Sequence, residues 1–262
     1  MSALILTVCE LPDDPDRLDA RWDELAEAVR RDGSDLVLLP ELPFAPWLCT
    51  APEFSADAWR AAVAADERWR ARLSDLGTAA VITTRPVDTG HDRFNEAYLW
   101  TATDGERALR AKVHLPHEDG FWERSWFTPA RPEWDTVRVG PVDVGMLICS
   151  EMWHFDLARG YHLDGAGLLL VPRASSASWS ERWLAGGRSV ALVSGAWCAS
   201  ANRRGGGPGF GGDCWIVDPE GQVVARTSAD RPIVSAAVDA GLVDLAGDRY
   251  PRTVFTPALS HP

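Results

Sequence analysis

Positive charge, long apolar runs and a basic leader are scarce or missing in this sequence. Its 262 residues hold 26 Lys and Arg against 38 Asp and Glu, which gives a formal net charge of -12. Because phosphate groups would be repelled, this balance argues against a nucleic-acid or anionic-membrane partner. No apolar stretch approaches the ~20 residues that span a bilayer, and the first residues run into acids without a basic segment before them. We therefore expect a cytoplasmic protein without a signal peptide.

Paired cysteines are also missing. The five cysteines are scattered and none stands in a CxxC pair: Cys9, Cys49, Cys149, Cys198 and Cys214. This pattern favours a reducing compartment over a disulfide framework or a structural zinc site. The stretch GGGPGFGG (205–212) lacks the Lys-Ser/Thr of a phosphate-binding loop, so we interpret it as a turn. Neither a metal nor a cofactor is expected.

Apolar patterns along the chain alternate between strands and helices. One helix is expected before Gly33, with Leu18, Trp22 and Leu25 on one face, and Ser55 can cap a second. Further helices are expected over 155–164 and 180–198, and strands over 3–11, 34–41, 79–87, 95–115 with a hairpin at Asp104-Gly105, 136–140, 142–149, 167–175 and 213–228. No repeat or linker interrupts this pattern, which predicts a single α/β domain over 1–262.

Three apolar strands end on, or are interrupted by, a chemically reactive residue. LVLLP ends at Glu41, RALRAK reaches Lys112 inside a strand pattern, and VGMLIC ends at Cys149. Charged groups beside apolar runs are costly to bury unless they are paired. A carboxylate and an ammonium that converge on a thiol would share this cost. Such a group would form a nucleophilic site, since the ammonium favours the thiolate and the carboxylate can carry protons.

Structural alternatives exist for each of these residues. Glu41 can cap an element, Lys112 can extend its ammonium to water, and Cys149 can fill the core. A metal site would need ligands beyond Cys149, Glu151 and His154, and no second ligand cluster follows in the sequence. A papain-like pair would use His114, His154 or His162 as the base, but the local signatures of that class are absent.

Several motifs in order resemble the carbon–nitrogen hydrolase (nitrilase) superfamily. They are LLPELPF around Glu41, KVHLP around Lys112, ICSEMW around Cys149, Asn95, Asp104-Gly105, Asn202, the FGG at 210–212 and the DPEG at 218–221. The segment KVHLPHEDGFWERSWFTPA is similar, without a gap, to N-carbamoylputrescine amidase-like and N-carbamoyl amino acid amidohydrolase-like members. The resemblance covers nearly the whole chain and implies a four-layer αββα fold that uses no cofactor.

The resemblance also implies roles for individual residues. Cys149 would be the nucleophile, Glu41 the general acid and base, and Lys112 the stabiliser of the oxyanion, together with the backbone N–H of Ser150. Glu123 falls where the family has a second glutamate that holds the lysine and the substrate. A solvated loop charge is the alternative for Glu123.

Substrate contacts are expected from aromatic residues and one arginine. Trp47, Trp126 and Trp153 lie in loops expected around the nucleophile, although each can equally serve in packing. Arg173 ends the strand GLLLVP, where a guanidinium can bind a substrate carboxylate bidentately. An ion pair at a subunit interface is the alternative for Arg173. If Arg173 faces the pocket, the substrate is a small acid with a distal amide or carbamoyl group.

Three functional readings follow. The first is a hydrolase that cleaves an amide or N-carbamoyl group of a small molecule through a thioester. The second is a true nitrilase, and the third is a catalytically silent binding protein of the same fold. We further expect a homodimer or a larger even homo-oligomer, with the C-terminal tail (about 247–262) at the interface.

Overall fold

The structure is a computed structural model that describes residues 3–247 and 249–254. Its strands are β1 (Ala3–Pro12), β2 (Leu36–Leu38), β3 (Ala80–Asp88), β4 (Arg93–Thr101), β5 (Gly105–Ala111), β6 (Val137–Val139), β7 (Val142–Met146), β8 (Leu168–Arg173), β9 (Trp197–Gly205), β10 (Phe210–Gly211), β11 (Trp215–Val217), β12 (Val223–Arg226) and β13 (Ile233–Asp239). Its α-helices are α1 (Leu18–Asp32), α2 (Ala56–Arg70), α3 (Glu123–Trp126), α4 (Phe155–Leu163), α5 (Ser180–Ser194) and α6 (Ala240–Gly247). The short 3-10 helices are η1 (Pro15–Arg17), η2 (Leu48–Thr50), η3 (Leu73–Leu76), η4 (Cys149–Trp153), η5 (Ala177–Trp179) and η6 (Arg252–Val254).

Strand β1 joins two sets of strands. On one side β2 and β3 continue in parallel, and β4 and β5 follow antiparallel. On the other side the last residues of β1 pair in parallel with β9, and β8, β7 and the antiparallel edge strand β6 follow. The order is therefore β5-β4-β3-β2-β1-β9-β8-β7-β6, which places β5 and β7 far apart in the pairing.

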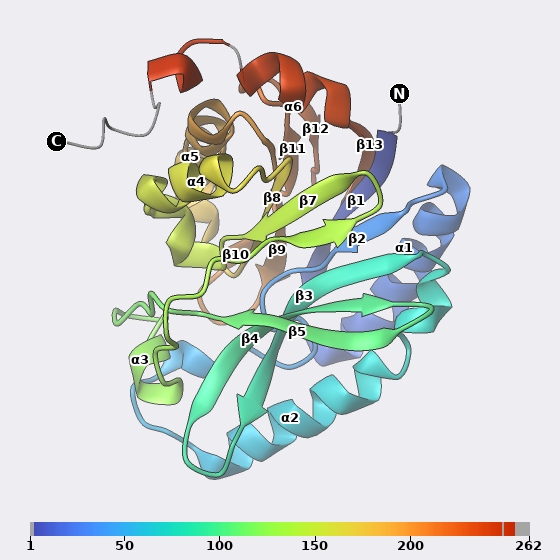
Figure 1. The fold of residues 1–262 in the computed structure, drawn as a ribbon. Coiled ribbons are helices and arrows are strands. Elements are labelled where there is room, and N and C mark those ends of the chain that lie inside the picture. Colours follow the sequence, from blue (N-terminus) through green and yellow to red (C-terminus); the bar gives the residue numbers. More distant parts are fainter. Residues whose placement is uncertain (1–2, 248, 255–262) are drawn as a thin grey trace, which may run out of the picture.

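The two sets of strands face each other and helices cover their outer sides (Figure 1). In β2, Leu36 and Leu38 belong to the same buried cluster as Val144 and Met146 of β7. The intervening Val37 belongs instead to the cluster formed with α1. Because strand side chains alternate between faces, β2 is buried on both sides. This arrangement is the four-layer αββα architecture that the resemblance implied.

Two glycines let α5 lie close to the sheet. A Cβ on Gly187 would come within 2.1 Å of the Trp215 ring, and a Cβ on Gly186 would come within 2.7 Å of Met152. The sequence Gly186-Gly187 is unfavourable in a helix, but here it allows contact with β11 and with η4. This packing supports the segment that begins at Cys149.

Several elements differ from the sequence-based expectation, among them strand β13 and helix α6, which the sequence did not predict. The helix expected over 180–198 ends at Ser194, because Gly195 has φ +67° and Trp197 begins the buried strand β9. The second helix, whose apolar pattern predicted that it would include Leu73 and Leu76, ends at Arg70, and these two leucines belong to η3. The expected loop 116–135 contains the short helix α3. Short apolar runs fit a strand or a helix equally well, so burial between β1 and β8 decides for β9.

Part of the predicted interface tail falls outside the described residues, namely 248 and 255–262.

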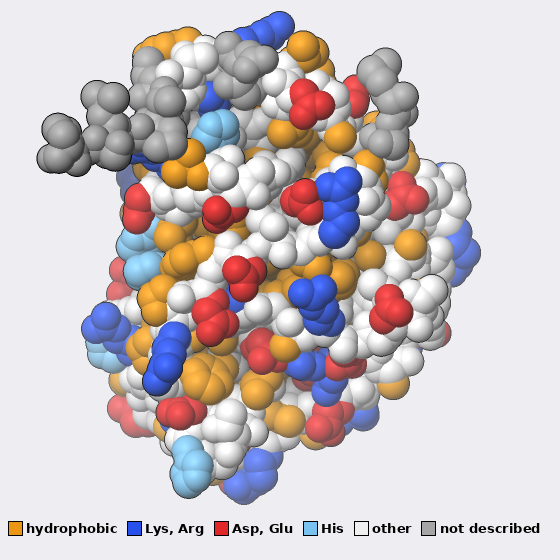
Figure 2. Space-filling view, viewed as in Figure 1, with side chains coloured by type: hydrophobic (Ala, Val, Ile, Leu, Met, Phe, Trp, Pro, Cys, Tyr) orange, Lys and Arg blue, Asp and Glu red, His pale blue; other side chains and the backbone are white. Residues whose placement is uncertain are grey.

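Figure 2 views the molecule as in Figure 1 and shows apolar side chains along the level where the two sheets meet, with acidic and basic side chains scattered among them. Within the described residues, no helix combines the length and apolarity that crossing a membrane would require.

Candidate active site

The four predicted reactive residues follow strand ends or open a short helix, and all are buried. Glu41 lies three residues after β2, Lys112 directly follows β5, and Cys149 lies three residues after β7. Glu123 is the first residue of α3. Glu41, Lys112 and Glu123 are 0% exposed and Cys149 is 4% exposed. The alternative of a solvated loop charge therefore does not hold for Glu123.

Lys112 lies between two carboxylates. Its Nζ donates to Glu41 Oε1 at 2.8 Å and to both carboxylate oxygens of Glu123 at 2.8 Å. Asn95 Nδ2 donates to the same Glu41 oxygen at 2.7 Å. The ammonium is therefore buried and paired, rather than extended to water. Lys112 is also the single lysine of the chain.

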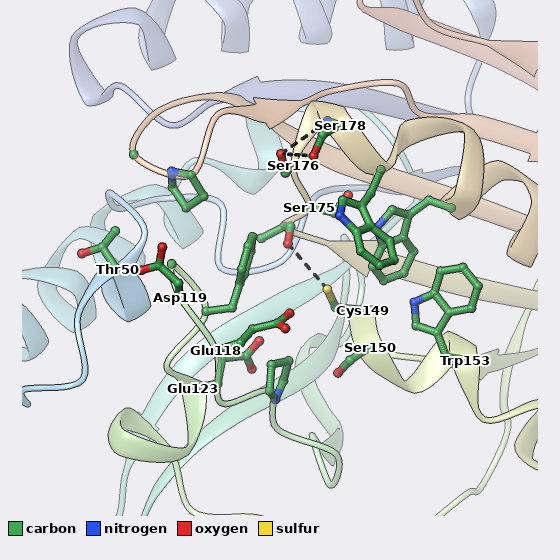
Figure 3. Close-up of a pocket in the computed structure, with 18 residues that line it drawn as sticks. Thr50, Glu118, Asp119, Glu123, Cys149, Ser150, Trp153, Ser175, Ser176 and Ser178 are labelled. Carbon is green, nitrogen blue, oxygen red and sulfur yellow. Dashed lines mark hydrogen bonds between the residues drawn. The ribbon is translucent and has the colours of Figure 1, made fainter.

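Cys149 occupies a strained turn between β7 and η4. Its φ is +50°, a left-handed conformation that non-glycine residues rarely adopt. Its Sγ lies 3.7 Å from the carbonyl oxygen of Ala174, the residue after β8. Figure 3 shows this contact and the Cys149 side chain within the pocket. Such strain persists only where the surrounding structure supports it, and it is frequent at functional sites.

Burial and charge set the protonation of this cluster. Burial alone would lower the pKa of Lys112, but the carboxylates of Glu123 and Glu41 outweigh it and hold the pKa well above its ordinary value. Burial raises the pKa of Glu123 to about 8, although Lys112 opposes this. Burial and the nearby Glu41 carboxylate raise the pKa of the Cys149 thiol well above its ordinary value. A nucleophilic role for Cys149, as predicted from the sequence, would therefore require a base.

The two oxygens of the Glu41 carboxylate differ in their hydrogen bonds. Glu41 Oε1 accepts two hydrogen bonds, whereas the buried Oε2 has no hydrogen-bond partner in the described part of the chain. The backbone of Glu41 is held by Arg203 of β9, whose Nη1 donates to the Glu41 carbonyl at 3.2 Å. Arg203 is itself buried and paired with Asp13. The carboxylate is thus positioned by a rigid support.

A pocket of about 890 Å³ opens above Cys149. Its lining combines Glu123, Ser150 and Ser175 with the aromatic rings of Trp153 and Trp183. Two further carboxylates, those of Glu118 and Asp119, also line it, whereas no Lys or Arg belongs to the lining formed by the described residues. The lining can therefore hold a small molecule with an apolar body, but it offers no cation to a substrate carboxylate.

The predicted contact residues Ser150 and Trp153 lie in this pocket, and Trp47 and Trp126 do not. Ser150 Oγ donates to the His114 carbonyl at 2.7 Å. Trp47 is buried; its Nε1 donates to the Gly120 carbonyl at 3.0 Å and its ring packs against Phe121. Trp126 Nε1 donates to the Ala51 carbonyl at 2.8 Å. Both rings hold loops behind the lining and take the packing role that the sequence left open.

Arg173 corrects a prediction. The side chain is 0% exposed and is not part of the pocket lining. Its Nε donates to Ser200 Oγ at 2.7 Å, and its other nitrogens donate to Ser175 Oγ and to the carbonyls of Gly212 and Asp213. These acceptors are neutral and belong to the same chain. Arg173 is therefore placed neither to bind a substrate carboxylate nor to form an ion pair between subunits. Its hydrogen bonds hold two loops together.

Other site residues were not assigned a role from the sequence. Glu118, Ser175 and Trp183 line the pocket, and Glu151 binds Arg110 beneath it. Glu151 carried a signal, because it is a carboxylate that closely follows an apolar strand. Trp183 carried none, since helix 180–194 gave no indication of which face meets the pocket. Within residues 3–247 and 249–254, no group of three or more His, Cys, Asp or Glu could hold a metal ion.

The family model of the carbon-nitrogen hydrolases matches residues 10–247. The chain belongs to the carbon-nitrogen hydrolase family. Among curated proteins, this carbon-nitrogen hydrolase is 32% identical over 251 residues to the glutamine-dependent NAD(+) synthetase of Rhodobacter capsulatus, covering 91% of this chain and 43% of the synthetase. It is 23% identical over 236 residues to the N-carbamoylputrescine amidase of Arabidopsis thaliana, covering 79% and 76% of the two chains. It spans about half the length, or less, of the first curated relatives that it matches.

Solved structures agree with the fold of this carbon-nitrogen hydrolase. The crystal structure of a carbon-nitrogen hydrolase from Helicobacter pylori G27 superposes with a TM-score of 0.86 at 20% identity, covering 98% of this chain and 96% of that one. An amidase mutant from Nesterenkonia sp. AN1 superposes with a TM-score of 0.75 at 23% identity, covering 96% and 95%. Its structure shows covalent addition of the acetamide moiety of fluoroacetamide at the active-site cysteine. The predicted mixed α/β fold of the nitrilase type is confirmed.

Proposed function

We propose that this carbon-nitrogen hydrolase cleaves the C–N bond of a small amide or N-carbamoyl compound through a thioester on Cys149. The observation that carries the proposal is the buried Lys112 ammonium held between Glu41 and Glu123, beside a thiol that lines a pocket of about 890 Å³. A structural ion pair needs neither a neighbouring nucleophile nor space for a substrate.

In the first step, Glu41 Oε2 accepts the proton of the Cys149 thiol while the sulfur attacks the carbonyl carbon. The carbonyl π electrons move to oxygen, and the resulting oxyanion is stabilised by the Lys112 ammonium and the backbone N–H of Ser150. Removal of one such donor typically slows turnover ~10²–10³-fold. Glu123 holds Lys112 in place through its two hydrogen bonds.

In the second step, the oxyanion collapses, the C–N bond breaks and Glu41 gives its proton to the leaving nitrogen, so that ammonia or an amine departs. Water then loses a proton to Glu41 and attacks the thioester, and the sulfur leaves and regains a proton. The products are an acid and the free thiol. The amidase relative with an acetamide moiety from fluoroacetamide on its cysteine supports a nucleophilic cysteine at this place in the fold.

The charge of the lining suggests which substrates fit. Glu118 and Asp119 would repel an anionic tail, and the buried Arg173 offers it no partner. We therefore propose a neutral or positively charged substrate in place of the acidic one expected from the sequence. Glutamine is a second candidate, because the relative with 32% identity is named for its dependence on glutamine.

A panel of compounds scored for ammonia release tests the function. It contains an ω-amino amide, an unsubstituted amide and a dicarboxylic-acid monoamide of equal length, with glutamine, an N-carbamoyl amine and a nitrile. We expect release from the amino or neutral amides and none with Cys149→Ala. Release from the nitrile alone would establish the nitrilase reading, and no release with an unreactive Cys149 would favour the silent binding protein.

Assembly and location remain proposals of the same kind. Exposed apolar side chains on α4 and α6, such as Leu163 at 53% and Leu245 at 57% exposure, fit the expected contact between protomers. Light scattering at micromolar concentration should give a dimer or a larger even oligomer, and a monomer would contradict it. The five free, buried cysteines fit the reducing cytoplasm that we propose as the location.

A further inference from the structure

Glu151 accepts more hydrogen bonds than the pairing of one carboxylate requires. Its side chain is 0% exposed, and Arg110 binds it bidentately, with Nη1 at 2.6 Å from Oε2 and Nη2 at 2.7 Å from Oε1. Backbone N–H groups add to this, from Val113 at 2.8 Å, His114 at 3.5 Å and Ile148 at 2.9 Å. Both oxygens are therefore fully used inside the protein.

The donors to Glu151 flank two reactive residues. Arg110 and Val113 lie on either side of Lys112, and Ile148 directly precedes Cys149. One carboxylate thus connects the backbone that presents the ammonium with the backbone that presents the thiol. Ser150 adds a second connection in the same direction, because its Oγ donates to the His114 carbonyl at 2.7 Å.

The fold makes this connection necessary. Lys112 follows β5 and Cys149 follows β7, and six strands separate β5 from β7 in the pairing order. No ladder within the described strands joins the two segments directly. Their relative position therefore depends on side chains that cross between the facing sheets, and Glu151 provides the most extensive of these contacts.

The charge of this connection is balanced. Burial would raise the pKa of Glu151, but hydrogen bonds from Arg110 and the backbone hold it below its ordinary value, so the group stays anionic. Arg110 Nε donates to the Glu133 carbonyl at 3.0 Å, and its guanidinium lies 4.3 Å from the Trp134 ring. The pair therefore carries no net charge, and it can set distances without neutralising Lys112.

We propose that Glu151 is a positioning residue that sets the distance between the Lys112 ammonium and the Cys149 thiol. The expected effect on turnover rests on the proposed function. The effect on the distance between Lys112 and Cys149 does not depend on it. In Glu151→Gln the amide NH₂ cannot accept a hydrogen bond, so either the Val113 or the Ile148 contact is lost and Arg110 is left unpaired.

The matched control is Glu10→Gln. Glu10 is also buried, pairs with Arg204, and accepts a backbone N–H, from Asp213 at 2.9 Å. It contacts neither Lys112 nor Cys149 in the described structure. Both substitutions remove a buried negative charge beside an arginine, so both should lower Tm.

The single lysine provides a readout that does not depend on turnover. Protein made with ¹³Cε-lysine gives one lysine signal, which reports on Lys112 alone. We expect Glu151→Gln to move this signal, to weaken its response to alkylation of Cys149 by iodoacetamide, and to slow that alkylation about tenfold or more. On an accepted substrate, kcat should fall about tenfold or more, with KM within twofold. Glu10→Gln should leave the lysine signal, its response to alkylation, the alkylation rate and kcat unchanged.

A loss of Tm alone in Glu151→Gln, matching that of Glu10→Gln, would overturn the proposal. If Glu151→Gln does not fold, Arg110→Gln keeps Lys112 as the single lysine and removes the bidentate pairing, and an unmoved Lys112 signal there would overturn the proposal equally. If no compound is turned over by the native chain, the proposed function fails, while the lysine signal and the alkylation rate still decide the role of Glu151.

Discussion

Two buried carboxylates among the described residues have raised pKa values, and only one of these two lines the pocket. Burial raises the pKa of Glu123 to about 8 and that of Asp66 to about 7. Each is paired with a cation, Glu123 with Lys112 and Asp66 with Arg70 on the next turn of α2. Each neighbourhood also holds a buried carboxylate oxygen without a hydrogen-bond partner among the described residues, Glu41 Oε2 in one and Asp66 Oδ1 in the other.

The difference lies in the space and in the nucleophile. The cavity beside Asp66 measures about 10 Å³, whereas the pocket that Glu123 lines measures about 890 Å³ and contains the strained Cys149. A raised pKa and an unpartnered oxygen therefore report burial. Only a reactive group and room for a substrate turn such a cluster into a candidate active site.

The largest expected effect lies in the region of Glu123, at Cys149. Cys149→Ala should lower turnover by about 10⁴-fold or more, because the thioester cannot form. Cys198→Ala, at a buried cysteine of β9, should leave turnover within a few fold. Both should keep the native circular dichroism spectrum. Substantial turnover in folded Cys149→Ala would remove the proposed mechanism.

Replacement of each carboxylate by its amide sharpens the comparison. Glu41→Gln should reduce kcat about 10²–10⁴-fold, since it loses the group that moves protons. Asp66→Asn should leave kcat unchanged. Steady-state rates on the best compound of the panel provide the measurement. Equal effects at the two positions would mean that the cluster around Lys112 is structural, like that around Asp66.

The variant Arg173→Met tests whether this buried guanidinium binds the substrate or only stabilises the fold. Arg173→Met leaves the part-buried Asp213 carbonyl without its Arg173 donor and leaves the Gly212 carbonyl with Asn202 alone, and loss of such donors typically costs about 1–3 kcal/mol of stability. Tm should fall, and any change in KM should be the same for acidic and neutral amides. A tenfold rise in KM confined to acidic amides would restore the carboxylate clamp.

The smallest effect on turnover is expected for Asp66→Asn. This substitution should change the pH dependence of stability instead. The pKa of Asp66 is raised from 3.8 to about 7 in the folded chain. The folded state therefore binds the Asp66 proton more tightly than the unfolded state does. The contribution of this proton to the free energy of unfolding is complete below about pH 4 and is lost as the pH rises through about 7. Asp66→Asn cannot titrate, so its stability should fall less between pH 4 and 8, by about 1 kcal/mol or more. Urea unfolding at both pH values measures this difference, and parallel curves would contradict the assignment.

The sequence by itself determined where the reactive residues stand along the chain. An apolar strand followed by one charged or reactive residue is a local pattern, and it identified Glu41, Lys112 and Cys149 before any contact was known. The same kind of local pattern identified most strands and the helix before Gly33. Such short-range regularities identify the predicted strands and helices, but they did not identify β9, β13 or α6.

Only the tertiary structure decided which side chains meet the substrate. Arg173 and Ser175 lie close together in the sequence, yet the Arg173 side chain is buried against Ser200 and the carbonyls of a loop, and Ser175 lines the pocket. The strand β9 was decided by burial between β1 and β8, and the role of Glu151 by donors from a strand far away in the pairing order. The physical reason is that side-chain direction changes from one residue to the next, and contacts between distant segments leave no period in the sequence.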